Sequence, residues 1–180
     1  MRLNTTAGWK NSVVELFVLE SRDVTETYVG WLNDPGVNRY LESRFSVHTI
    51  DSTCQFVESC LASSSTLLLG IKSIDLQGAH VGNIKLSQID RHHGLAEVGI
   101  LVGDTKAWGK GIASSAISCL MGIARNDLGL RKLTAGCYAS NVGSEKAFLK
   151  VGFHKAGERK DHFLLDGEPE AMVLMDCLLR

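Results

Sequence analysis

A Gly-rich turn between a strand and a long helix constrains the fold of this chain more than any other feature. The turn, Lys106-Ala-Trp-Gly-Lys-Gly-Ile-Ala-Ser114, follows the apolar segment 95–102. Because Gly109 and Gly111 lack Cβ atoms, backbone N–H groups can approach an anion there. The helix that follows adds its own unpaired N–H groups and the positive end of its dipole. The turn therefore predicts a site for a phosphate or diphosphate.

Two nucleotide-binding folds use similar turns, and both fit this sequence poorly. A Rossmann fingerprint requires a third Gly where Ser114 stands, and an acidic residue at the end of the next strand, where residues 138–140 read Tyr-Ala-Ser. A Walker P-loop requires Gly-x-x-x-x-Gly-Lys-Ser/Thr, which the sequence lacks. A Gly-x-Gly turn can also merely connect a strand to a helix. The residues around the turn must therefore distinguish a phosphate site from a simple connection.

Hydrophobic periodicity predicts about seven strands and four helices. Strands are expected at about 13–19, 66–74, 80–90, 95–102 and 132–138, and as a hairpin over 154–178 that turns at Asp166-Gly167. Helices are expected at about 23–33, 50–63, 112–129 and 142–151. Strands that first run together and then alternate with helices favour an α/β fold in one domain, 1–180, with helices on both faces of a mixed sheet.

Two details of the first helices follow from spacing. Asp23 and Glu26 have the spacing of a capping box, which predicts that the first helix begins at Asp23 and runs to about Asn33, before Pro35. The second helix is expected to bury one face, made of Ile50, Cys54, Val57 and Leu61.

Charge and composition exclude several classes of protein. A net charge of −1 and a pI of about 6.6 argue against a broad nucleic-acid-binding surface. The first residues lack the apolar core of a signal peptide, and no apolar run approaches the ~20 residues that span a bilayer, so we expect a cytoplasmic protein without a membrane segment.

Cysteine and histidine usage predicts neither disulfides nor a metal. The five cysteines are odd in number and form no Cys-x-x-Cys pair, which indicates a reducing compartment and cysteines packed in the core. Asp90, His92 and His93 share one turn but have no third ligand at a suitable spacing, so we expect a solvated turn.

Two motifs resemble those of a known family. Glu97-Val-Gly-Ile-Leu-Val followed by Trp108-Gly-Lys-Gly-Ile-Ala resembles the cofactor motif of the GNAT acetyltransferases, Gln/Arg-x-x-Gly-x-Gly/Ala, and residues 141–153 look like their second motif. The segment 31–35 and the Trp-Gly-Lys-Gly sequence are most similar to the Rim-type subgroup, which includes ribosomal-protein N-terminal acetyltransferases and many small-molecule amine acetyltransferases. The resemblance implies a mostly antiparallel sheet splayed in the middle and acetyl-CoA as cosubstrate, with no metal.

The resemblance also implies which residues hold acetyl-CoA. Backbone amides of Gly109, Lys110, Gly111, Ile112 and Ala113 would bind the pyrophosphate, with the Ser114 hydroxyl added. The strand that contains Val98, Ile100 and Leu101 would pair with the pantetheine arm, and Asn141 would contact the cofactor near the thioester. Two positions depart from the family pattern: Lys106 replaces Gln or Arg, and Phe148 replaces the Tyr that serves many relatives as the general acid.

The chemistry of acetyl transfer assigns two candidate catalytic residues. An amine with a pKa of ~8 to 10.4 arrives mostly protonated at neutral pH, so a base is useful, and Glu97 is the best-placed carboxylate by analogy. Its alternative is a strand-end Glu in solvent or in a surface pair. A thiol has a pKa of ~8.5, so an acid is helpful rather than essential. We expect Ser144, or a water it orders, to supply the proton, with Tyr138 as a second candidate; the alternative is that Ser144 caps its helix.

The acceptor stays open at this stage. Trp31, Tyr40 and Arg44 lie in the region where relatives shape the acceptor pocket, although they can equally be core of that region. We expect direct transfer in a ternary complex, without an acetylated enzyme, to a protein N-terminal α-amino group or to a small amine or amino sugar. The alternative function is a catalytically silent acyl-CoA-binding regulatory module. Monomer and homodimer are both compatible with the sequence.

Overall fold

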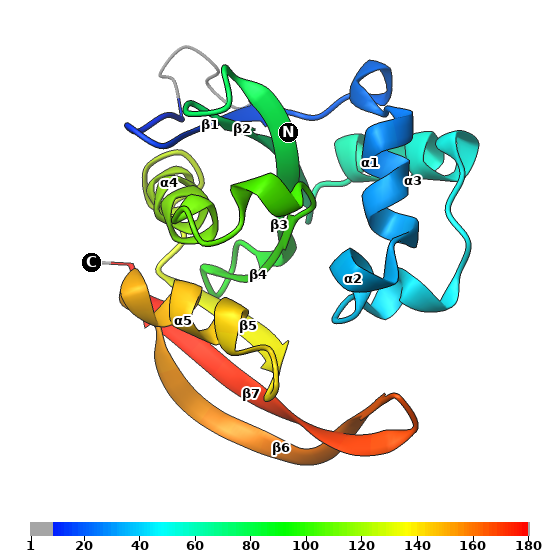
Figure 1. The fold of residues 1–180 in the computed structure, drawn as a ribbon. Coiled ribbons are helices and arrows are strands. Elements are labelled where there is room, and N and C mark those ends of the chain that lie inside the picture. Colours follow the sequence, from blue (N-terminus) through cyan, green and yellow to red (C-terminus); the bar gives the residue numbers. More distant parts are fainter. Residues whose placement is uncertain (1–8, 180) are drawn as a thin grey trace.

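One sheet organises the part of the chain that this computed structural model describes, residues 9–179 (Figure 1). Residues 1–8, where the sequence predicts no signal peptide, and Arg180 lie outside that range. The strand order is β1-β2-β3-β4-β5-β7-β6, antiparallel throughout except for the parallel pair β4 and β5. The strands are β1 (Val14–Val18), β2 (Leu67–Ser73), β3 (Ala79–Asp90), β4 (Leu95–Val102), β5 (Lys132–Tyr138), β6 (His154–Leu165) and β7 (Glu168–Leu178). The predicted mixed sheet is confirmed.

Helices cover both faces of this sheet (Figure 1). They are α1 (Glu26–Asn33), α2 (Pro35–Asn38), α3 (Ile50–Ala62), α4 (Ile112–Asn126) and α5 (Val142–Lys150), with short 3-10 turns η1 (Ser21–Asp23), η2 (Glu42–Phe45) and η3 (Thr105–Ala107). The larger hydrophobic core joins α4 and α5 to one face of the strands, and a smaller one joins α1 and α3 to the other. No helix within the described range is long and apolar enough to cross a membrane.

The starting residue predicted for the first helix is wrong. The Asp23 carboxylate accepts a hydrogen bond from the Glu20 amide at 2.9 Å and so closes η1, the turn before the helix. Helix α1 begins at Glu26, where the Thr25 hydroxyl accepts the Tyr28 amide at 3.2 Å. It ends at Asn33 as expected, because Pro35 starts the separate helix α2.

The buried face predicted for α3 needs one correction. Val57 is fully buried and Ile50 and Cys54 are half-buried against the smaller core, but Leu61 is 43% exposed. Cys60 takes its place in the smaller core, because it lies about 100° before Leu61 around the helix.

A close contact between Gly103 and Trp31 fixes α1 against the end of β4. A Cβ atom built on Gly103 would lie 2.1 Å from a ring carbon of Trp31, which is buried. We therefore expect Gly103→Ala to destabilise the protein by about 2 kcal/mol, a fall in Tm of roughly 4–8 °C in thermal unfolding.

Gly30→Ala is the matched control on α1. A Cβ atom there meets nothing within 4 Å, so this helical substitution is expected to hold or raise Tm. A Gly103→Ala variant as stable as the parent would contradict the packing of Trp31 described above.

Candidate active site

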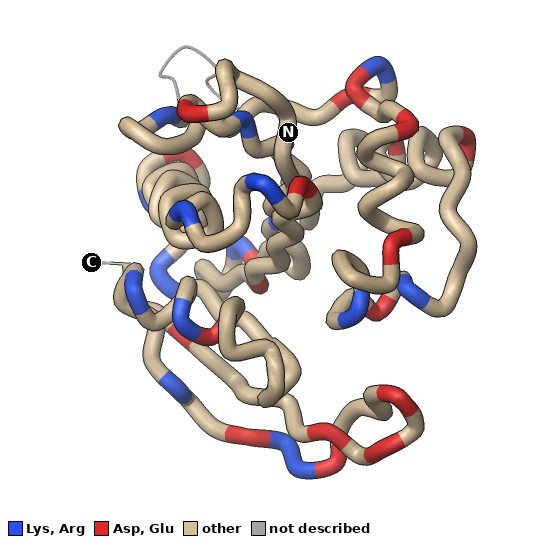
Figure 2. The backbone as a smooth tube through the Cα atoms, viewed as in Figure 1, with Lys and Arg blue, Asp and Glu red and all other residues tan. Residues whose placement is uncertain are grey.

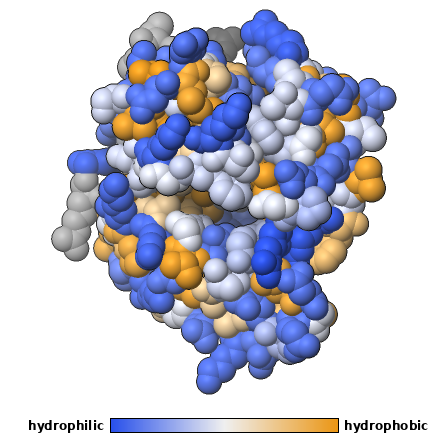
Figure 3. All heavy atoms as spheres, in the orientation of Figure 1, coloured by the Kyte–Doolittle hydropathy of each residue, from blue (hydrophilic) through white to orange (hydrophobic). Residues whose placement is uncertain are grey.

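A gap opens in the middle of the sheet between β4 and β5. The two strands pair at only three positions, Leu95↔Lys132, Ala96↔Leu133 and Glu97↔Thr134. Beyond them β4 stays paired with β3 as far as Val102, and β5 stays paired with β7 as far as Tyr138. The halves of the sheet therefore diverge, and Figure 3, in the orientation of Figure 1, shows the surface hollowed at this place. The backbone groups on the facing edge of β4 are left for a ligand.

The Gly-rich turn lies at the open end of this gap, directly after β4. Gly109 and Gly111 both adopt left-handed backbone angles, with φ of 73° and 75°, and Gly111 is the N-cap of α4. The first amide of this segment with a backbone partner is Ser115, which donates to the Gly111 carbonyl at 3.0 Å. Among the described residues, none accepts a hydrogen bond of normal geometry from the amides of residues 109–114. A run of free N–H groups at a helix start suits an anion.

Side chains around the turn hold its shape and add positive charge. The Trp108 indole donates to the Val102 carbonyl at 2.8 Å, and the Ser114 hydroxyl donates to the Gly111 carbonyl at 3.0 Å. Lys106 and Lys110 are exposed, and Figure 2 shows basic segments on the loop that leads into α4. Lys106 replaces the usual Gln or Arg without affecting the backbone amides that form the anion site.

Glu97 stands at the base of the gap, as the last residue of β4 that pairs with β5. Val98 and Ile100 pack in the larger core on the α4 side, so alternation along the strand places Glu97 and Leu101 on the face toward α1 and α3. The Gln88 side-chain amide donates to Oε2 of Glu97 at 2.9 Å. Oε1 has no partner among the described residues and is free to accept a proton.

Helix α5 begins at the same open end, because it follows β5, which runs parallel to β4. Asn141 is its N-cap, and the Asn141 Oδ1 accepts the Ser144 amide at 3.1 Å. Asn141 therefore makes the helix cap that was the alternative role for Ser144. The Ser144 side chain lies near the Cys137 thiol, whose pKa is raised by burial. Phe148 is buried in the larger core, with its ring 4.9 Å from that of Phe153.

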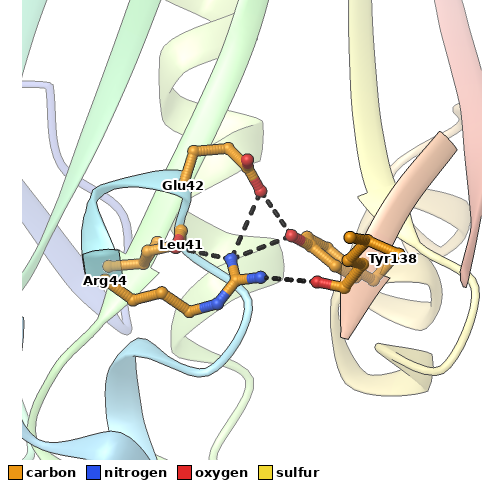
Figure 4. Close-up of polar contacts among 5 residues, drawn as sticks. Leu41, Glu42, Arg44 and Tyr138 are labelled. Atoms are coloured by element: carbon orange, nitrogen blue, oxygen red, sulfur yellow. Dashed lines mark hydrogen bonds and ion pairs between the residues drawn. The ribbon is translucent and has the colours of Figure 1, made fainter. Parts of the chain in front are cut away.

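A polar cluster at the end of β5 joins three segments that are distant in the sequence (Figure 4). The Arg44 guanidinium donates to the Tyr138 hydroxyl at 2.8 Å and to the Leu164 carbonyl at 3.0 Å, and the Tyr138 hydroxyl donates to Glu42. Burial raises the pKa of Tyr138, and the hydrogen bond to Glu42 raises it further, so the phenol stays protonated at neutral pH. Sequence reasoning missed Glu42. Its only local signal is that it is an acidic residue two positions before Arg44.

The three residues expected near the acceptor do not lie together. Tyr40 and Arg44 both meet Tyr138, since the Tyr40 ring lies 5.5 Å from the Tyr138 ring. Trp31 instead lies on the β1 to β3 side, where its ring packs at 5.2 Å against His80 and lines a cavity of about 350 Å³. Within residues 9–179 no group of three or more His, Cys, Asp or Glu side chains is placed to hold a metal ion.

Known proteins share this fold and parts of this sequence. The profile of the acetyltransferase (GNAT) domain matches residues 14–154. The uncharacterized N-acetyltransferase YoaA of Bacillus subtilis is 26% identical over 153 residues, which cover 84% of this chain and 85% of YoaA.

Two solved structures illustrate the shared fold. The spermidine N-acetyltransferase of Vibrio cholerae, in complex with CoA and spermine, superposes with a TM-score of 0.83 at 20% identity, covering 94% of this chain and 97% of that one. Mycobacterium smegmatis RimJ, in complex with CoA-disulfide, has a TM-score of 0.79 at 18% identity, covering 92% and 81%.

Proposed function

The chain belongs to the GNAT acetyltransferase family, and from this membership we propose that it transfers the acetyl group of acetyl-CoA to the nitrogen of a primary amine. The observation that carries the proposal is the coincidence of three features at one place. The sheet opens between β4 and β5, a run of unpaired amides lies at the open end of the gap, and a carboxylate with a free oxygen lies at its base.

The anion site fits the pyrophosphate of acetyl-CoA. We assign the backbone amides of Gly109, Lys110, Gly111, Ile112 and Ala113 to the pyrophosphate oxygens, with the Ser114 oxygen beside them. The free backbone edge of β4 at Val98, Ile100 and Leu101 is assigned to the pantetheine amides, which hydrogen-bond as a strand does. The Asn141 side-chain nitrogen, which makes no hydrogen bond within the described range, is assigned to the region near the thioester.

Glu97 is assigned as the general base. Bound acetyl-CoA supplies a thioester carbonyl as the electrophile. The free Oε1 of Glu97 takes the proton from the amine, directly or through one water, so that the neutral amine attacks. Backbone N–H groups on the open edge of β4 stabilise the oxyanion, and transfer proceeds in one ternary complex.

Ser144 is assigned as the source of the proton for the departing thiolate, directly or through an ordered water, with Tyr138 second. Asn141 caps α5 by accepting a hydrogen bond from the Ser144 backbone amide, and the Ser144 hydroxyl takes no part in this cap. Ser144→Ala is therefore expected to leave Tm and the KM for acetyl-CoA unchanged. Its kcat is expected to fall about 10-fold, a modest effect because thiolate is a tolerable leaving group. A lower Tm with normal kcat would give Ser144 a structural role.

The acceptor proposed is a protein N-terminal α-amino group or a small amine such as a polyamine or an amino sugar. The similarity to a spermidine N-acetyltransferase and the Rim-type segment 31–35 support this range. Tyr40, Arg44 and Trp31 are proposed to shape the acceptor side. Because the Arg44 donors contact Leu41, Tyr138 and Leu164, we assign Arg44 to holding η2 against β5.

Steady-state kinetics with a panel of spermidine, glucosamine and a Ser-initiated peptide tests the reaction. Direct transfer predicts intersecting initial-velocity patterns and an acetylated amine in the mass spectrum, with no acetyl group on the protein. Parallel patterns together with an acetylated protein would contradict direct transfer. The alternative function, an acyl-CoA-binding module without activity, is favoured by the buried Phe148 at the usual Tyr position and predicts CoA binding without turnover.

A further inference from the structure

A β-bulge in β3 lies directly opposite the proposed base. The pairing of β3 with β4 shifts from Ser87↔Glu97 to Asp90↔Leu95, so two residues of β3, Gln88 and Ile89, face the single residue Ala96. Gln88 adopts a φ of 53°, a left-handed conformation that a non-Gly residue adopts rarely and at a cost. Such strain persists only where the surroundings impose it.

The bulge changes which side chain reaches which face of the sheet. In regular pairing Gln88 would oppose Ala96, whose side chain is buried in the larger core. Ile89 is in that core instead, and Gln88 leaves it. The Gln88 amide then reaches across to Glu97, donating to Oε2 at 2.9 Å. One extra residue thus brings a hydrogen-bond donor to a carboxylate that otherwise has no described partner.

We propose that Gln88 is a positioning residue for Glu97. Its amide holds Oε2 and fixes the rotamer of the carboxylate, which leaves Oε1 aimed at the acceptor amine. This inference rests on the proposed role of Glu97 as the base. The bulge then has a function besides packing Ile89, because it supplies the group that orients the base.

Other charged groups on this face do not change between the variants that test the proposal. By strand alternation and register they are Lys85 and Asp90 on β3, Lys132 on β5, Asp176 on β7 and His154 on β6. Lys132 and His154 both pair with Asp176, which limits their influence on Glu97. A change in kcat that follows the identity of residue 88 alone therefore reports on the Gln88 amide.

Gln88→Gly separates the hydrogen bond from the bulge. Glycine adopts positive φ without strain, so the bulge is kept and Tm is expected to hold or rise, while the amide is removed. We expect kcat, measured with the best amine of the panel above, to fall about 10-fold, because the carboxylate loses the hydrogen bond that fixes its rotamer. The KM for acetyl-CoA should stay unchanged.

Two further variants complete the test. Gln77→Gly is the matched control, because Gln77 has a φ of 55° in the turn between β2 and β3 and is exposed; it should stabilise similarly and leave kcat unchanged. Gln88→Lys keeps a hydrogen-bond donor at this position and is expected to retain more of the parent's kcat than Gln88→Gly. If Gln88→Gly keeps the parent's kcat, Gln88 only builds the bulge and the proposal is overturned.

The failure of the base assignment would look different. In that case Glu97→Gln retains the parent's rate at every pH. If Glu97 is the base but Gln88 does not position it, Glu97→Gln loses activity and Gln88→Gly does not. Positioning and catalysis are thus measured separately.

Discussion

Gly111→Val is expected to abolish the thermal stabilisation that CoA gives this protein. For the parent, CoA at 100 times its Kd should add about 2.7 kcal/mol, a rise in Tm of roughly 5–10 °C. A Val at a φ of 75° cannot keep the turn that aims the amides of residues 109–114 at the pyrophosphate. A Cβ atom at this position meets only the Ser114 hydroxyl, at 3.9 Å, so the variant is expected to fold, with a Tm lowered by several degrees.

Gly129→Val is the matched control for backbone strain. Gly129 has a φ of 65° in the loop between α4 and β5, and a Cβ atom there meets nothing within 4 Å. This variant should lose a similar amount of stability and keep the full CoA shift. A normal CoA shift in Gly111→Val would mean that the pyrophosphate binds elsewhere.

Glu97→Gln is expected to lower kcat about 100- to 1,000-fold near neutral pH. The loss should be largest at low pH and shrink as pH rises toward the pKa of the amine, because a neutral amine needs no base. The KM for acetyl-CoA should change little, since the site that we propose for the pyrophosphate is made of backbone amides at the other end of the gap. Full pH profiles of kcat and kcat/KM check this.

Glu15→Gln controls for the loss of a strand carboxylate. Glu15 lies on β1 and pairs with Lys10 at 3.4 Å, far from the gap in strand order, so this variant should turn over like the parent. A Glu97→Gln enzyme with the parent's rate at every pH would assign the base to water or to another residue.

The strands follow from local pattern, which is why the sequence predicts them well. Alternating and β-branched segments lie within a few residues of the observed strands, and the Gly-x-Gly turn needs only its own backbone and the helix after it. The opening between β4 and β5 was expected from the family resemblance alone. Its physical cause is that each of these strands keeps a different antiparallel partner, which hydrophobic periodicity does not reveal.

Features that depend on contacts between distant segments could not be predicted from the sequence pattern. The Gln88 bulge arises from register between two strands, and the cluster of Glu42, Arg44 and Tyr138 joins residues about a hundred positions apart. The start of α1 was misplaced because Asp23 has the right spacing for two alternative caps, and only the structure shows that it closes η1.

Thiol release from acetyl-CoA in the presence of the amine panel distinguishes an acetyltransferase from a silent acyl-CoA-binding module. We expect release that depends on at least one amine, matched by the acetylated amine in equal amount, and reduced in both Glu97→Gln and Gly111→Val. CoA binding without release for any amine would contradict it and would favour the silent acyl-CoA-binding module.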